Sequence, residues 1–262
     1  MDTPLISIRG LRKSYGSGYE KNEVLKGITL DISPGQIIGY IGPNGSGKST
    51  TVKILCGILT DFEGEIEVFG LDVRKNRIAI KKRIGYVPEN CAIYDLLTPR
   101  AYLDLIASLY DMDFDKAGDR ATQLLSFFGM EAHADQRMDT FSKGMKQKIL
   151  IIAGIINNPD ILYLDEPLSG LDANAVILVK ELLTRFVAGG KTVFYCSHLM
   201  DIVEKISDRI LLLHNGIVVA DGSFEELKTG SADTLERLFA QLTGNEDQGN
   251  NADELFRTLN EQ

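Results

Sequence analysis

A glycine-rich run closed by a lysine and two hydroxyl residues is the first feature of the sequence that could do chemistry. Its residues are Gly42, Pro43, Asn44, Gly45, Ser46, Gly47, Lys48, Ser49 and Thr50. The spacing matches G-x-x-x-x-G-K-[ST], in which backbone N–H groups turn inward around phosphate oxygens and a helix start adds its positive end. We expect Lys48 to reach the β- and γ-phosphates of a nucleotide and Ser49 to ligate Mg²⁺. The run therefore predicts a phosphate-binding loop.

A pair of carboxylates, Asp165 and Glu166, follows the apolar run ILYL. Phosphoryl transfer needs both the divalent ion and the attacking water to be ordered. Asp165 ends a predicted buried strand, so it is expected at the carboxyl edge of the sheet, where open α/β folds bind ligands. Glu166 could orient or deprotonate water. Alone, such a pair also fits a turn or a helix start, but together with the loop at 42–50 it indicates the second half of a nucleotide site.

A third candidate is the helix that begins after Ser142, a natural N-cap. Lys143, Lys146 and Lys148 place positive charge at this helix start, where the helix dipole favours acidic residues. An anion bound there would relieve the conflict. The plainer alternative is that these lysines are exposed and solvated.

These residues need a framework, and the pattern of apolar residues predicts one. Strand-like segments fill the region from Leu5 to about Ile41, and buried-strand runs recur at 161–165, 193–197 and 210–213. Between about Asn90 and Pro159 the apolar residues instead follow helix spacing, which predicts a helical insertion. Strands that alternate with helices imply a mostly parallel sheet covered on both faces.

Composition narrows the function classes. The chain has 262 residues, 44% of them hydrophobic, and a formal net charge of −9. An acidic chain is a poor general binder of nucleic acid, because that affinity comes mostly from basic side chains.

Three dispersed cysteines suggest neither a disulfide framework nor a zinc site. We see no secretory signal, and the densest apolar run, 149–156, is shorter than the roughly 20 residues that span a bilayer. We therefore expect a chain that is soluble by itself, which does not exclude docking onto a membrane protein.

The order of these motifs resembles the nucleotide-binding subunit of an ATP-binding cassette (ABC) transporter, over about Leu5 to Lys228. GPNGSGKST corresponds to Walker A, ILYLDEP to Walker B, FSKGM to the LSGGQ signature and SGLD at 169–172 to the D-loop. His198 stands where the family has its switch histidine, although a lone histidine can also simply cap or pack. Tyr15 stands where an aromatic ring stacks on adenine, although it could be an ordinary aromatic of the β region.

The resemblance implies an α/β P-loop NTPase fold with a mostly parallel sheet, an N-terminal antiparallel β region and a helical subdomain. It implies a nucleotide-binding domain at 1–230, with the helical subdomain inserted at about 90–158, and a C-terminal helix and polar tail at 231–262. It also implies an Mg²⁺-dependent ATPase with Glu166 and His198 as catalytic residues.

The same resemblance implies partners. Two nucleotide-binding subunits, identical or different, would pack head to tail, so that ATP bound by one is contacted by Ser142, Lys143 and Gly144 of the other, with Asp172 also near the nucleotide. A separately encoded transmembrane permease would hold the pair on the inner face of the cell membrane, with no nucleic acid involved. Tyr94, Leu96, Leu97 and Tyr102 are candidates for the permease contact, although core packing explains them equally well.

Two departures from the family pattern matter. Glu89 replaces the usual glutamine after a strand and proline; its carboxylate could bind Mg²⁺ beside Ser49 and Asp165, but it adds negative charge near the γ-phosphate. In the signature, Lys143 and Met145 replace glycine and glutamine. With one short cassette, these features resemble the ATPase subunits of bacterial ABC-2-type exporters.

The alternative function is a soluble ABC-type ATPase that acts on nucleic acid or ribosomes, which the negative charge disfavours. A nucleotide-binding regulator without catalysis is disfavoured because Asp165, Glu166 and His198 are all present.

Overall fold

The computed structural model describes residues 3–16, 18, 21–90, 93–228 and 234–243. The polar tail expected after Gly244 lies outside these ranges. The strands are β1 (Ile6–Tyr15), β2 (Asn22–Ile32), β3 (Ile37–Ile41), β4 (Glu63–Val68), β5 (Leu71–Asp72), β6 (Ile84–Val87), β7 (Ile161–Asp165), β8 (Thr192–Ser197), β9 (Arg209–His214) and β10 (Ile217–Gly222). The helices are α1 (Lys48–Leu55), α2 (Arg77–Lys81), α3 (Pro99–Leu109), α4 (Phe114–Phe127), α5 (Lys143–Ile155), α6 (Ala173–Ala188), α7 (Met200–Ile206), α8 (Phe224–Leu227) and α9 (Leu235–Thr243), with short 3-10 turns η2 (Glu131–His133) and η3 (Met138–Thr140).

Two sheets organise the molecule. The first is antiparallel, in the order β2-β1-β4-β5. The second has the order β10-β9-β3-β8-β7-β6, and every neighbouring pair in it is parallel except β9 with β10. The predicted fold class, a mostly parallel sheet joined to an N-terminal antiparallel region, is confirmed.

The second sheet separates two hydrophobic cores, because successive side chains of a strand point to opposite faces. In β3, Ile37 and Ile41 pack into the core that includes the helices α3 to α7. Ile38 and Tyr40 face the other core, shared with α1 and the antiparallel sheet. All five residues of β3 are buried, which explains why its sequence is continuously apolar.

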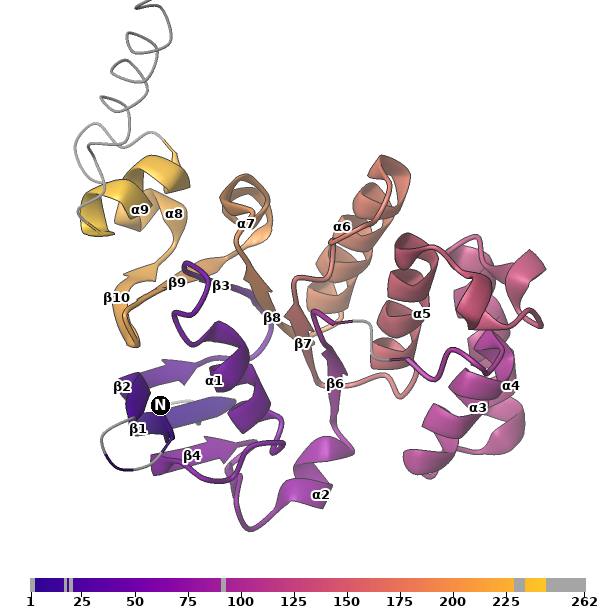
Figure 1. The fold of residues 1–262 in the computed structure, drawn as a ribbon, viewed down its shortest axis with the longest axis horizontal. Coiled ribbons are helices and arrows are strands. Elements are labelled where there is room, and N and C mark those ends of the chain that lie inside the picture. Colours follow the sequence, from indigo (N-terminus) through magenta and orange to yellow (C-terminus); the bar gives the residue numbers. More distant parts are fainter. Residues whose placement is uncertain (1–2, 17, 19–20, 91–92, 229–233, 244–262) are drawn as a thin grey trace, which may run out of the picture.

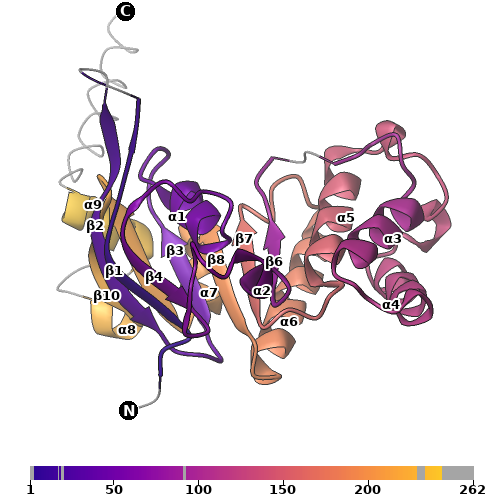
Figure 2. The ribbon, with the colours of Figure 1, turned by 90° about the horizontal axis from the view of Figure 1, so that it is seen from below.

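Helices α3, α4 and α5 form one end of the molecule, and the antiparallel sheet forms the other, as Figures 1 and 2 both show. Thr98 caps α3, with Pro99 as its first residue, and Asp113 caps α4. Helix α5 returns to the sheet beside β6, where Gly85 and Gly154 meet so closely that a Cβ on Gly85 would collide with the Gly154 carbonyl oxygen. This contact joins the helical end to the sheet.

The C-terminal part of the described chain lies against α7. Leu235 and Leu238 of α9 are fully buried there. Strands β9 and β10 form a hairpin, with His214 ending β9 and both Asn215 and Gly216 at positive φ. Among the described helices, none combines the length and the apolar character needed to cross a bilayer.

Candidate functional site

The strand order of the parallel sheet brings the candidate residues to one edge. Strand β8 lies between β3 and β7, so Ile41 is paired with Ser197 and Cys196 with Asp165. The chain therefore leaves all three strands at the same level. The loop at 42–50, the Asp165–Glu166 pair and His198 follow these strand ends, so segments far apart in sequence become neighbours.

The loop between β3 and α1 is folded as a cradle. Gly45 and Gly47 have φ values of 79° and 109°, which side-chain-bearing residues rarely adopt. Lys48 curls back across the loop and donates from Nζ to the carbonyl oxygens of Gly42 (2.6 Å) and Pro43 (3.2 Å). The buried Ser46 hydroxyl has no hydrogen-bond partner within the described residues. An unsatisfied buried hydroxyl and a lysine held only by neutral carbonyls are groups that a phosphate would satisfy.

A cavity of about 430 Å³ opens beside this loop. The loop residues Asn44, Gly45, Gly47, Lys48, Ser49 and Thr50 line it together with Glu89, Asp165, Glu166, Asn22 and Val24. Lysine, hydroxyl groups and carboxylates thus meet in one hollow, although Lys48 and Asp165 are more than a hundred residues apart in the chain.

The pKa of Asp165 is affected by the charged groups that share the cavity with it. Burial raises the pKa of its carboxyl group, and the nearby charges of Glu89 and Glu166 raise it further, whereas a hydrogen bond from Ser49 and the charge of Lys48 oppose the rise. A divalent cation beside Asp165 and Ser49 would neutralise the surplus negative charge. Hydroxyl and carboxylate oxygens are the donors that Mg²⁺ prefers. No group of three or more His, Cys, Asp or Glu side chains gathers as a metal site in the described chain, so such an ion would complete its shell with phosphate and water oxygens, and the donor set fits Mg²⁺.

Glu166 is held from the neighbouring strand end. Its Oε1 accepts hydrogen bonds from the backbone N–H (2.8 Å) and the ring Nδ1 (2.7 Å) of His198, and its Oε2 accepts one from Ser197 Oγ (3.0 Å). The Glu166 backbone has φ 50°, a left-handed conformation that is unusual for a glutamate. The side chain is nearly buried, while the ring of His198 is 61% exposed. The carboxylate is therefore fixed, and the imidazole beside it is accessible.

Tyr15, at the end of β1, lies next to the loop. Its hydroxyl is 3.4 Å from Thr50 Oγ1, and Lys13 Nζ lies 4.8 Å from the centre of its ring. The side chain is 42% exposed. An aromatic face is thus available near the loop.

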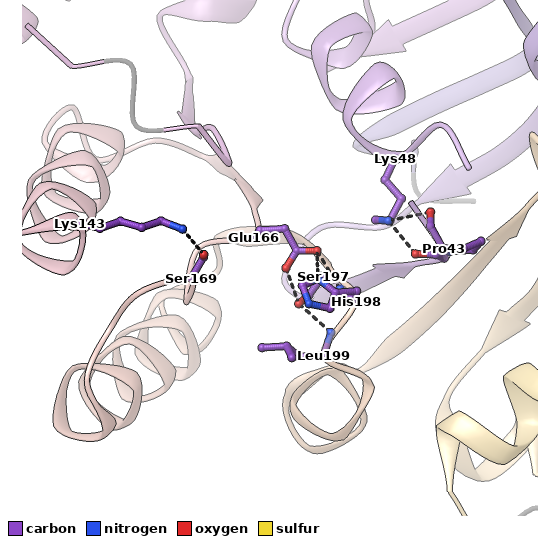
Figure 3. A network of polar contacts seen from close by, with 9 residues as sticks. Pro43, Lys48, Lys143, Glu166, Ser169, Ser197, His198 and Leu199 are labelled. Atoms are coloured by element: carbon purple, nitrogen blue, oxygen red, sulfur yellow. Dashed lines mark hydrogen bonds and ion pairs between the residues drawn. The ribbon is translucent and has the colours of Figure 1, made fainter. Parts of the chain in front are cut away.

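The signature-like residues are placed elsewhere. Ser142 caps α5 by accepting from the Met145 N–H (3.2 Å), and Lys143 and Gly144 follow it. Asp172 caps α6 by accepting from the Ala175 N–H (2.9 Å). None of these four residues lines the 430 Å³ cavity, and Figure 3 shows Lys143 on α5, separated from Lys48 by the Glu166 segment.

Some residues of the site were not predicted from the sequence. Ser197 holds Glu166, and Asn22 and Val24 line the cavity. Ser197 could have been found, because it is a polar residue that ends a buried strand just before His198. Ser169, the first residue of SGLD at 169–172, accepts a hydrogen bond from Lys143, and this contact was not predicted from the sequence.

Comparison with known proteins agrees with this geometry. Residues 25–169 match the ABC transporter family. The ABC-type transporter ATP-binding protein EcsA of Bacillus subtilis is 34% identical over 88% of this chain and 95% of its own. The Nod factor export ATP-binding protein I of Ralstonia nicotianae is 32% identical over 87% of this chain and 70% of its own. Among solved structures, the dimeric, post-hydrolysis ATP-binding cassette MJ0796 bound to ADP and Pi superposes with a TM-score of 0.77 at 26% identity, over 83% of this chain and 98% of that one.

Proposed function

The chain belongs to the ABC transporter family, as an ATP-binding protein with ATPase activity, and from this premise we propose that it powers a separately encoded membrane permease in the direction of export. The observation that carries the proposal is the shared cavity of Lys48, Ser49, Asp165 and Glu166. The export direction is supported by the similarity to the Nod factor export protein.

In this proposal the loop at 42–50 holds the triphosphate. Lys48 exchanges the neutral carbonyls of Gly42 and Pro43 for phosphate oxygens, and this charge-assisted contact is stronger than the one it replaces. The backbone N–H groups and the start of α1 add to the attraction for the anion. Tyr15 contributes its exposed ring to adenine.

Ser49 and Asp165 would hold Mg²⁺, and Glu89 lines the same cavity. A bound Mg²⁺ would supply positive charge that offsets the negative charge developing during phosphoryl transfer. Glu89 brings a carboxylate in place of a neutral amide, so it would contact the ion directly or through a water molecule.

Glu166 would accept the proton of the attacking water. Ser197 and His198 keep both of its oxygens in place, and a carboxylate has further lone pairs for the water. The exposed ring of His198 lies beside the same carboxylate, where it could contact the γ-phosphate. Positioning of this kind provides most of the catalysis in phosphoryl transfer.

A second subunit would complete the site. Ser142, Lys143, Gly144 and Asp172 lie outside the cavity of their own chain, so any contact of theirs with nucleotide would be made to the partner's. The dimeric arrangement of MJ0796 supports this proposal. Closure would follow ATP binding only as far as ATP binds the closed pair better than the open one.

The permease would dock on an apolar groove of about 430 Å³ between the sheet and the helical end. Its lining includes Ile58, Ile78, Tyr102, Ile106 and Leu109, and several of these side chains are strongly exposed, Ile78 by 70% and Leu109 by 69%. Of the four candidates from the sequence, Tyr94 and Leu96 are exposed, whereas Tyr102 is buried in the core and Leu97 packs against it. A membrane-side contact on this groove would keep the chain at the inner face of the cell membrane.

The test is hydrolysis by the purified protein, with and without Mg²⁺. We expect Mg²⁺-dependent release of phosphate, and Lys48→Ala to weaken nucleotide binding by about 10-fold or more because a charge-assisted contact is lost. Lys116→Met, on the exposed face of α4, is the control. Equal nucleotide affinity in Lys48→Ala and wild type would reject the site.

The permease link is tested separately. Capture of the tagged chain from detergent-solubilised membranes should retain a polytopic membrane protein, and Leu109→Asp should reduce that retention. Salt-sensitive stimulation of hydrolysis by RNA, DNA or ribosomes, with no retained membrane protein, would instead favour the alternative function.

A further inference from the structure

One face of α5 is fastened to the segment that follows Glu166. Gln147 Nε2 donates to the carbonyl oxygen of Pro167 (3.0 Å), and Lys148 Nζ lies 3.4 Å from a carboxylate oxygen of Asp172. One turn earlier on the same face, Lys143 Nζ donates to Ser169 Oγ (2.8 Å). Lys143 and Gln147 are four positions apart and share one face of the helix, so their contacts lie one above the other along α5, and Lys148 lies beside them.

The Lys143 contact is supported by close packing. A Cβ on Gly170 would lie only 3.1 Å from Lys143 Cδ, so the aliphatic part of the lysine passes directly over this glycine. A Cβ on Gly144 would lie 2.5 Å from the carbonyl oxygen of Gly170. The start of α5 and the segment at 169–171 are therefore in backbone contact, and the lysine covers their junction.

Ser169 in turn belongs to the same tight turn as Glu166. The Ser169 N–H donates to the Glu166 carbonyl oxygen (3.2 Å), and the Glu166 N–H donates to the Cys196 carbonyl oxygen (2.9 Å). The turn begins at the unusual left-handed backbone of Glu166. Such a conformation persists only when the surrounding contacts hold it, and the Lys143 contact holds the far end of the turn.

Lys143 differs from the other lysines of this helix start. Lys146 and Lys148 each lie near a carboxylate, of Asp95 and Asp172 respectively. Lys143 instead ends on a neutral hydroxyl, and no carboxylate of the described chain lies within ion-pair distance of it. Lys143 therefore makes a specific hydrogen bond to Ser169, whereas Lys146 and Lys148 are paired with opposite charges.

We propose that Lys143 is a positioning residue that fixes Glu166 through Ser169. The proposal rests on the ATPase function proposed above and assigns Lys143 a role within its own chain, instead of a direct contact with the partner's nucleotide. The start of α5 and the turn of Glu166 then move as one unit. A displacement of α5 by the partner's nucleotide would thereby reach the carboxylate of its own chain.

The test is a double-mutant cycle on ATP hydrolysis. Lys143→Met keeps the aliphatic stem over Gly170 and removes the donor, and Ser169→Ala removes the acceptor. We expect each change to lower kcat by about 10-fold, with KM for ATP little changed, because a misplaced catalytic group slows chemistry without weakening binding. The double variant should be no slower than either single variant, since both remove one contact.

Lys116→Met is the control and should behave as wild type, as should the melting temperature of all the variants. The inference is overturned if the two effects multiply, if Lys143→Met raises KM while Ser169→Ala is silent, or if neither change affects kcat. The first two results would point to direct contact of Lys143 with nucleotide. If the wild type itself hydrolyses no ATP, the proposed function fails, which is a distinguishable outcome.

Discussion

Glu166 Oε1 lies 2.7 Å from Nδ1 of His198, and the same oxygen accepts the His198 backbone N–H. The two residues come from neighbouring strand ends, 32 positions apart in sequence. The carboxylate is thus oriented by contacts within its own chain, to a residue whose ring is exposed. Preorganisation of this kind avoids the cost of ordering a catalytic group during the reaction.

Replacing Glu166 by Gln should separate binding from hydrolysis. The amide keeps nearly the same shape but cannot take a proton, so we expect hydrolysis to fall by about 10² or more while ATP binding stays within about threefold. Phosphate release and the affinity for a fluorescent ATP analogue measure the two effects. Glu181→Gln, on the exposed side of α6, is the matched control; a Glu166→Gln protein that hydrolyses at the normal rate would remove Glu166 from its role.

Ser142 can be tested without losing its cap. Asp is as good an N-cap as Ser and complements the helix dipole, so Ser142→Asp should keep the melting temperature. Its negative charge would repel a partner's γ-phosphate, and we expect hydrolysis to fall by about 10-fold or more. ATP binding measured at protein concentrations too low for dimerisation should be unaffected. Thr98→Asp, at the cap of α3, is the control, and an equal loss of activity in it would contradict the shared site.

Tyr15 offers a test of adenine recognition. Tyr15→Ala should raise KM for ATP by about 10-fold, because stacking of a base on an aromatic ring is worth about 1–3 kcal/mol. Tyr15→Phe should be near wild type, since its ring remains and only the long contact to Thr50 is lost. A Tyr15→Phe variant as weak as Tyr15→Ala would assign the effect to the hydroxyl group instead.

Substitution by alanine should have opposite effects on the free energy of unfolding at two glycines. Gly85→Ala would press a methyl group into the Gly154 carbonyl, so we expect a loss of about 3 kcal/mol in the free energy of unfolding. Gly118, inside α4, has open space around its missing Cβ, and Gly118→Ala should stabilise by about 0.5–1 kcal/mol. Urea unfolding of both variants measures the contrast, and a tolerated Gly85→Ala would contradict the close approach of α5 to β6.

Asp160 predicts a dependence of stability on pH. Burial acts to raise its pKa, but hydrogen bonds from Lys191 and Arg83 outweigh that effect, and the net pKa is lowered from 3.8. A lowered folded-state pKa stabilises the protein above the unfolded value and ceases to do so as pH falls through the folded one. Asp160→Asn should therefore cost up to about 1 kcal/mol at pH 7, since the group is partly exposed. The difference between variant and wild type should shrink below about pH 4; a constant difference across pH would contradict the ion pairs.

The sequence predicted what depends on local pattern. The loop at 42–50 follows a fixed spacing, Asp165 ends a continuously apolar strand, and the helices α3 to α5 carry apolar residues at helix spacing. Helix α2 was not predicted, because its five residues are too few to display a period.

What escaped prediction depends on contacts between distant segments. The Ser197 hydrogen bond to Glu166 requires the order of β7 and β8 to be known, and the sequence states only that both are strands. The Lys143 contact with Ser169 likewise depends on how α5 packs against the turn after Glu166. The residue types indicated a nucleotide site, whereas the hydrogen-bond partners of Glu166 and Lys143 depend on tertiary packing.

The backbone of Glu166 has a consequence for how this position tolerates change. Asparagine would adopt a φ of 50° with less strain than glutamate does, and unlike glycine it keeps a side-chain oxygen that can accept hydrogen bonds. A library selected only for thermal resistance should therefore drift toward asparagine at 166, and one selected for turnover should not. Position 166 would then be identified as part of the catalytic site, because selection for stability and selection for hydrolysis would favour different amino acids there.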